Sequence, residues 1–305
     1  MAWEMTPYEA RSADSQYQDR LRTIITLGES AMDTPQGVPA KTCFGTLPPM
    51  VFDLANGAPL VTERRISFWR KAIAEIFAFI NGARTTTELR KRGCSWWDEW
   101  ATPEKCRSMG LEAGDLGPGS YGPVFHDFPR IVYENGKCVG TATFNQFAHL
   151  INQIREFPTL RTLRISNWIP YYIGRGGFQR AVVSPCHGDL MVRILGGKLH
   201  LTMVQRSADM PIGVPANMVQ YAALTLALAH VCGYEPGRYT HLLLDAHVYA
   251  NQIEVVTKMT AREPKRLPTL RLLNPPNDLF QFSPDNFQLE DYDPHPAITN
   301  IPVAV

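Results

Sequence analysis

The fold of this 305-residue chain is decided by residues 184–254, which read SPCHGDLMVRILGGKLHLTMVQRSADMPIGVPANMVQYAALTLALAHVCGYEPGRYTHLLLDAHVYANQIE. Three extended runs surround one long helix, expected from Asn217 to Val231. This helix is apolar nearly all round, which predicts that it is buried. Asn217 is expected to be its N-cap, and Gly233 stands where a C-terminal glycine belongs. Polar residues capable of chemistry stand at the ends of these elements, as is typical of an active site.

Away from this stretch, strand-like and helix-like segments alternate without a β-α-β rhythm. The pattern predicts an α+β fold in which a mixed β-sheet packs against helices. One domain is expected over 1–305, with a polar N-terminal extension at 1–14. Further helices are expected at 16–29, 66–80 and 144–155, and strands at 163–168, at 270–273 and on either side of an Asn56-Gly57 turn within 43–61.

Composition excludes several classes of protein. An apolar fraction of 45% with 19% charged residues is ordinary for a soluble globular chain. The net charge of +1 argues against a stable nucleic-acid partner. No run of about 20 apolar residues is present to span a membrane, and the N-terminus lacks the pattern of a signal peptide. We therefore expect a cytoplasmic protein.

The cysteines are scattered and form no Cys-x-x-Cys pair, so we predict reduced thiols and no metal site. They are Cys43, Cys94, Cys106, Cys138, Cys186 and Cys232. No glycine-rich phosphate loop is present, which weakens any nucleoside triphosphate or NAD interpretation. Cys186 follows a Ser-Pro pair and precedes a histidine, and it becomes a nucleophile only as a thiolate beside a cation. Arg206 is the predicted cation, provided that the two strands pair. The plain alternative is a small buried hydrophobic residue.

Four separated motifs carry a family resemblance. They are PCH at 185–187, QRSAD at 205–209, GVPAN at 213–217 and DAHVY at 245–249. In this order they resemble thymidylate synthase, and the likeness extends from about residue 16 to residue 305. The resemblance implies a thymidylate synthase-like fold and a homodimer formed through the sheet. It also implies 5,10-methylenetetrahydrofolate as the one-carbon donor and a dUMP-like nucleotide as its acceptor.

The resemblance also implies roles for individual residues. The catalytic residues would be Cys186, Glu75, Tyr121, Asn217 and Asp209. The nucleotide would be bound by Gln205, Arg206, Ser207, His187, Asn217, His247, Tyr249 and Arg161. The folate would be bound by Trp97, Trp100, Asp209, Gly213, Ala216 and Val305. Each has a plainer interpretation as a helix cap, a surface acid, a core aromatic or a strand-face polar residue.

The implied mechanism makes Cys186 add to C6 of uracil, so that C5 attacks the folate methylene. Glu75 would act through water on O4, and Tyr121 would serve removal of the C5 proton. The side-chain amide of Asn217 offers a donor and an acceptor side by side. That pattern complements O4 and N3–H of uracil, whereas cytosine presents the reverse.

Several positions depart from the family pattern. The loop at 33–38 lacks the expected phosphate-binding arginine, and Arg161 is followed by Thr162 instead of a second arginine. Arg164, Arg175 and Arg180 are possible replacements. Ala216 stands where the family usually has phenylalanine. Methyl transfer to dUMP is therefore the first interpretation. An alternative is 5-hydroxymethylation of dUMP or another pyrimidine nucleotide. A third is a non-catalytic homologue that binds a nucleotide or RNA.

Overall fold

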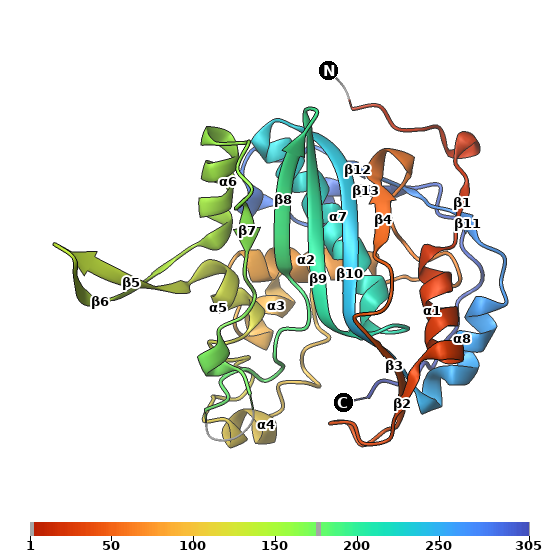
Figure 1. Ribbon diagram of the computed structural model, residues 1–305, viewed down its shortest axis with the longest axis horizontal. Coiled ribbons are helices and arrows are strands. Elements are labelled where there is room, and N and C mark those ends of the chain that lie inside the picture. The colour runs from red at the N-terminus through yellow and green to blue at the C-terminus, as the bar shows by residue number, and fades with distance from the viewer. Residues whose placement is uncertain (1–2, 175–177, 305) are drawn as a thin grey trace.

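The structure, a computed structural model, describes residues 3–174 and 178–304. Within these ranges a seven-stranded sheet with parallel and antiparallel pairs lies at the centre of the molecule (Figure 1). The strand order is β2-β3-β10-β9-β8-β7, and β4 also pairs with β10. The bounds of these strands are β2 (Glu29–Ala31), β3 (Ala40–Phe44), β4 (Met50–Asp53), β7 (Arg164–Ile165), β8 (Asp189–Leu195), β9 (Lys198–Asp209) and β10 (Glu235–Tyr249).

The remaining elements cover and flank this sheet, which confirms the α+β prediction. The small two-stranded sheets are β1 (Ala13–Asp14) with β11 (Lys265–Arg266), β5 (Phe128–Glu134) with β6 (Lys137–Phe144), and β12 (Thr269–Leu272) with β13 (Phe287–Glu290). The α-helices are α1 (Gln16–Leu27), α2 (Trp69–Ile80), α3 (Thr86–Lys91), α4 (Pro103–Ser108), α5 (Tyr121–His126), α6 (Gln146–Glu156), α7 (Gly213–Cys232) and α8 (Ile253–Thr260). Short 3-10 turns occur at η1 (Tyr8–Ala10), η2 (Leu54–Asn56), η3 (Pro170–Tyr172), η4 (Ala250–Gln252), η5 (Leu279–Gln281) and η6 (Pro284–Asn286).

The long helix α7 is the core of the fold. Nearly all of its side chains are buried, as its apolar composition predicts, and it packs against α2, β9 and β10. It ends as expected at Gly233, whose φ of 76° is the left-handed conformation that glycine adopts without strain. The predicted start is wrong, because the helix begins one turn earlier, at Gly213. Asn217 therefore lies inside the helix, and its amide is not used as a cap.

β9, α7 and β10 form a β-α-β unit, which the sequence pattern does not predict. The two strands pair in parallel, with Ser207 opposite Asp245 and Asp209 opposite His247. Because parallel strands end at the same edge of a sheet, the polar residues that close both strands are brought together there. This edge is where the candidate site lies.

Several shorter elements differ from the sequence-based expectation. The predicted hairpin at Asn56-Gly57 is wrong, since β3 and β4 do not pair with each other and instead pair with separate stretches of β10. Gly57, at a φ of 121°, packs against Leu267, so a Cβ there would lie 2.8 Å from the Leu267 Cβ. The strand expected at 163–168 is reduced to the two residues of β7. The expected helices at 16–29, 66–80 and 144–155 are confirmed as α1, α2 and α6, with ends shifted by a few residues.

A hairpin formed by β5 and β6 projects from the body of the molecule (Figure 1). The strands are joined through Asn135 and Gly136, whose φ values are 49° and 73°. Two successive positive φ values are what a type I′ hairpin turn requires, and Asn-Gly is its preferred sequence. The sequence thus contains the Asn-Gly signal for this hairpin.

The N-terminal extension packs on the body despite its polar composition. Arg11 is buried, and its guanidinium donates to the Leu267 carbonyl oxygen at 3.0 Å and to Thr269 Oγ1 at 2.8 Å. β1 adds an antiparallel pair with β11 beside it. These contacts tie the N-terminal segment to residues 265–269.

Candidate active site

The Cys186 thiol lies immediately before β8, beside the end of β9. Arg206 donates from its backbone amide to the Cys186 carbonyl oxygen at 2.7 Å and from Nη2 to the Cys186 Sγ at 3.6 Å. The Ser207 amide also approaches that carbonyl, at 3.4 Å. β8 and β9 pair antiparallel from Asp189 opposite Val204, and these two amides extend the contact between the two segments to Cys186. The strands therefore pair as predicted, and the guanidinium reaches the sulfur.

Arg206 is held in this position by further contacts. Its Nε donates to the Pro185 carbonyl oxygen at 3.2 Å, and its Cζ lies 5.2 Å from the centroid of the Trp168 ring. Burial raises the pKa of the Cys186 thiol, while Arg206, Tyr121 and Ser207 act in the opposite direction. A cation at the sulfur with additional hydrogen-bond donors is the environment that stabilises a thiolate nucleophile.

Tyr121, the first residue of α5, is placed directly against the nucleophile. Its hydroxyl oxygen accepts the backbone N–H of Cys186 at 2.6 Å. The ring stacks on His187 and on Phe79, with centroid separations of 4.6 and 4.9 Å. Burial raises the pKa of Tyr121 well above its ordinary value, so the phenol keeps its proton at neutral pH.

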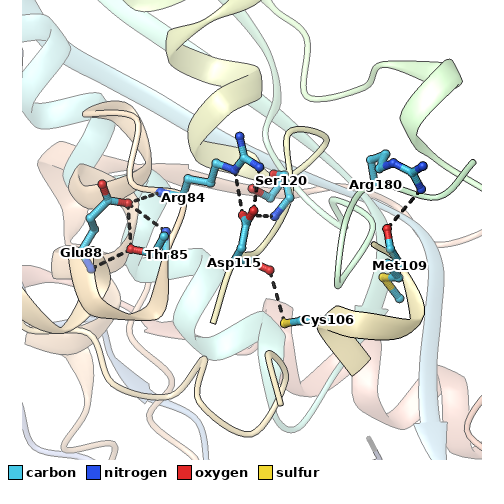
Figure 2. A network of polar contacts seen from close by, with 9 residues as sticks. Arg84, Thr85, Glu88, Cys106, Met109, Asp115, Ser120 and Arg180 are labelled. Atoms are coloured by element: carbon cyan, nitrogen blue, oxygen red, sulfur yellow. Dashed lines mark hydrogen bonds and ion pairs between the residues drawn. The ribbon is translucent and has the colours of Figure 1, made fainter. Parts of the chain in front are cut away.

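A polar network fixes the loop that leads into Tyr121 (Figure 2). Asp115 accepts from Arg84 Nε at 2.7 Å and Nη2 at 2.6 Å, and also from the Gly117 amide at 2.8 Å. Arg180 Nη1 donates to the Met109 carbonyl oxygen at 3.1 Å on the other side of the loop. A bidentate carboxylate–guanidinium pair gives a defined geometry, so these bonds hold the segment before Tyr121 in place.

His187 stays neutral beside these groups. Its Nδ1 lies 2.7 Å from the hydroxyl of Tyr221, a residue of α7. Burial lowers the pKa of His187 to about 3. The ring therefore supports the Tyr121 ring by stacking and carries no charge at neutral pH.

Glu75, on α2, is buried with hydrogen-bond donors on both carboxylate oxygens. Oε1 accepts from Trp96 Nε1 at 2.6 Å and from Trp97 Nε1, and Oε2 accepts from Gln220 Nε2. Cys94 Sγ lies 3.9 Å from Oε1. Burial raises the pKa of Glu75, and these donors oppose that rise. A buried carboxylate with a shifted pKa in such a network is a typical functional group.

Two residues that bond Glu75, Trp96 and Gln220, are not predicted as site residues from the sequence. Trp96 stands beside Trp97 in the CSWWDEW segment, and its indole N–H turns out to bond Glu75. Gln220 stands one helical turn after Asn217 on α7. A polar residue at i+3 from a candidate site residue in an otherwise apolar helix is the signal available for it.

The side-chain amide of Asn217 forms hydrogen bonds with two other buried side chains. Its Nδ2 donates to Gln220 Oε1 at 2.9 Å, and its Oδ1 accepts from Gln205 Nε2 at 3.0 Å. Gln205 Oε1 in turn lies 2.7 Å from His241 Nε2. The amide is thus held in one orientation and keeps one N–H and one lone pair beyond these two bonds.

Asp209 closes β9 and connects the site to the C-terminal tail. Gln252 Nε2 lies 3.3 and 3.2 Å from the two Asp209 carboxylate oxygens and donates to the Pro302 carbonyl oxygen at 2.9 Å. Burial raises the pKa of Asp209 to about 6, and His247 opposes the shift. His247 contacts Tyr249 with ring centroids 5.1 Å apart.

The remaining predicted folate-binding residues are Gly213, Ala216, Trp100 and Val305. Gly213 and Ala216 lie in the first turn of α7, and Ala216 is buried. Trp100 does not join the Glu75 network among the described contacts, and its ring stacks under Lys105 Nζ at 5.0 Å. Val305 falls outside the residues that the structure describes.

The predicted phosphate cations are not gathered at Cys186. Arg161 is exposed between α6 and β7, and in the described part of the chain no polar contact joins it to the site. Arg164 is paired with Asp189 through bonds of 3.1 and 2.8 Å, and Arg175 lies outside the described residues. Arg180 holds the loop before Tyr121 instead. Arg206 is the cation that contacts the thiol.

Within residues 3–174 and 178–304, no group of three or more histidine, cysteine, aspartate or glutamate side chains is arranged to hold a metal ion. In the same ranges, every helix is too short or too polar to cross a membrane.

The comparison with known families agrees with the site. A family model described as thymidylate synthase matches residues 15–305, which is nearly the whole chain. The match includes β9, α7 and β10 with all of the groups around Cys186. The folate-dependent enzymes of this family transfer a one-carbon unit to a pyrimidine nucleotide. On this match and on the thiol, carboxylate and amide arrangement just described, the protein belongs to the thymidylate synthase family.

Proposed function

We propose that the protein transfers a one-carbon unit from 5,10-methylenetetrahydrofolate to C5 of dUMP and releases the methylated nucleotide. The observation that carries the proposal is the Cys186 thiol, contacted by Arg206 and adjoining Tyr121. An edge-to-face contact of Tyr121 with Trp97 and a hydrogen bond from Trp97 to Glu75 then connect the nucleophile to the acid. A nucleophile with a cationic neighbour and a buried acid is more than a binding scaffold needs.

In the proposed reaction, Cys186 Sγ forms a bond to C6 of uracil. The electron pair of the C5–C6 double bond moves toward O4, so that C5 becomes nucleophilic. Asn217 supplies its remaining N–H, and Glu75 holds a water, where that charge develops. Preorganised donors at such an oxygen typically account for about 2.7–4 kcal/mol each.

The Asp209 carboxylate, held by Gln252 at the end of β9, supports binding of a pterin. Trp97 is buried against Phe79 and Tyr121. When bound, the folate supplies the methylene carbon and then a hydride. C5 loses its proton near Tyr121. Because that phenol keeps its own proton, we assign its oxygen to orienting the water that carries the C5 proton away. Elimination then breaks the C6–sulfur bond and restores the Cys186 thiolate.

Ala216 favours a second candidate, 5-hydroxymethylation. Its small side chain stands where the family usually has a phenylalanine against the folate. Less bulk at this position would admit water to the exocyclic methylene, and water in place of hydride would give the hydroxymethyl product.

Product analysis separates the two. Incubation with dUMP and 5,10-methylenetetrahydrofolate is expected to give a 5-methyl nucleotide by mass spectrometry, with a matching rise in dihydrofolate absorbance. A 5-hydroxymethyl nucleotide without dihydrofolate would replace the first proposal by the second. No modified nucleotide from dUMP would contradict both.

We further propose that the protein is a homodimer formed through the central sheet. Arg161 is exposed and unused in the described part of one chain, as expected for a residue that reaches the phosphate of a partner subunit. Sedimentation equilibrium at assay concentration is expected to give twice the mass of the 34.3 kDa chain. An active monomer would contradict this arrangement.

A further inference from the structure

A continuous chain of buried polar side chains runs through the site from His241 to Glu75. His241 Nε2 bonds Gln205 Oε1 at 2.7 Å, Gln205 Nε2 bonds Asn217 Oδ1 at 3.0 Å, and Asn217 Nδ2 bonds Gln220 Oε1 at 2.9 Å. Gln220 Nε2 then bonds Glu75 Oε2. All five side chains are at most 5% exposed, so water does not scramble their orientation.

The Glu75 end gives this chain one direction. An ionised carboxylate accepts hydrogen bonds and donates none, and the two indole N–H groups of Trp96 and Trp97, which can only donate, stabilise that ionised form. Gln220 must therefore turn its amide nitrogen to Glu75 and its oxygen to Asn217. The oxygen of Gln220 in turn requires the nitrogen of Asn217 to face it.

Gln205 sets the same direction at the other end of the chain. Its Nε2 also donates to the Ser207 carbonyl oxygen at 3.1 Å, and a carbonyl oxygen only accepts, so the Gln205 nitrogen faces Asn217. His241 adds no constraint, because its Nδ1 is buried and has no hydrogen-bond partner among the described residues, and a neutral imidazole carries its proton on either nitrogen. Reversal of the chain is thus opposed at both ends, by Glu75 and by the Ser207 carbonyl.

Resting on the function proposed above, we propose that Gln220 is a positioning residue for base selection. It transmits the acceptor character of Glu75 to Asn217 and, together with Gln205, makes the site select uracil over cytosine. In the observed direction, Asn217 presents an N–H on its Gln220 side and a lone pair on its Gln205 side. O4 and N3–H of uracil complement that order. The amine and unprotonated N3 of cytosine complement the reversed order.

The test compares nucleotide binding by two variants at the same position. Gln220→Met keeps much of the length and removes both polar atoms, so that Gln205 alone holds the direction of the Asn217 amide. The ratio of the dCMP to the dUMP dissociation constant, measured by titration calorimetry, is expected to fall by about tenfold or more, as the loss of a buried hydrogen-bond preference requires. In Gln220→Glu, one proton shared with Glu75 replaces the lost N–H donor, the other oxygen still presents an acceptor to Asn217, and the ratio is expected to stay near that of the native protein.

Gln18→Met is the matched control. Gln18 is equally buried, and it bonds the carbonyl oxygens of Met259 and Arg262, away from the site. Its substitution costs comparable buried hydrogen bonds and is expected to leave the ratio unchanged. A fall in the ratio that Gln18→Met shares would mean a general loss of stability and would overturn the assignment.

Other outcomes are separable. A folded Gln220→Met protein with the native ratio would overturn the role of Gln220 and leave the proposed function intact. A native protein that binds dUMP no better than dCMP would contradict the proposed uracil substrate first. If circular dichroism shows that Gln220→Met does not fold, Glu75→Gln takes its place. Its amide oxygen would face the two indole donors and its nitrogen would face Gln220, which opposes the observed direction, so an unchanged ratio there would equally overturn the inference.

Discussion

The Cys186→Ala variant is expected to lose about 10⁴-fold or more of its turnover while it still binds dUMP. Removal of a covalent nucleophile leaves only the contribution of binding and charge stabilisation, and losses of about this size follow in other nucleophile-dependent enzymes. The fold is expected to persist, because alanine keeps the backbone bonds of residue 186 to Arg206 and Tyr121. Initial rates and calorimetric dUMP affinity measure the two effects separately.

Cys138→Ala is the control for this substitution. Cys138 is exposed on β6, in the projecting hairpin, and its variant is expected to turn over as the native protein does. If Cys186→Ala turned over within tenfold of the native rate, Cys186 would not be the nucleophile.

The second large effect is expected from Arg206→Ala. Arg206 is one of the proposed nucleotide-binding residues, and we propose that it also contacts the phosphate of dUMP. Loss of one such charge-assisted hydrogen bond costs about 1.5–3 kcal/mol, which predicts roughly ten- to hundredfold weaker dUMP binding. The guanidinium also lowers the pKa of the Cys186 thiol against the effect of burial. Its removal therefore raises that pKa, and the midpoint of the pH profile for iodoacetamide alkylation of Cys186 is expected to move to higher pH.

Arg271→Ala is the control for Arg206→Ala, because it also removes one arginine. Arg271 is paired with Glu290 on the β12–β13 sheet, outside the site. Both the alkylation profile and dUMP affinity are expected to be unchanged in this variant. An Arg206→Ala protein with the native alkylation profile would show that the cation does not act on the sulfur.

The parts of the site that depend on one element's own pattern are predictable from the sequence. The apolar composition of residues 217–231 and the following Gly233 predict a buried helix, and α7 is that helix. The contact of Arg206 with Cys186 also follows, since pairing of two strand-like runs is enough to bring them together.

What is not predictable depends on how separate elements pack. Gln220 and Trp96 meet Glu75 only because α7 lies against α2 and the CSWWDEW segment turns beneath it. Asn217 resembles an N-cap because helix propensity is local, whereas the start of α7 is set by the Pro211-Ile212 exit from β9. The cations for the phosphate are the least predictable, as Arg164 and Arg180 are used in other contacts.

The central claim is that Cys186 forms a covalent bond to C6 of the pyrimidine. 5-Fluoro-dUMP tests it directly, because fluorine at C5 blocks the proton loss that would release the enzyme. After incubation with this nucleotide and 5,10-methylenetetrahydrofolate, peptide mass spectrometry is expected to find one adduct, on the peptide that contains Cys186. An unmodified Cys186 with both ligands saturating would contradict the account.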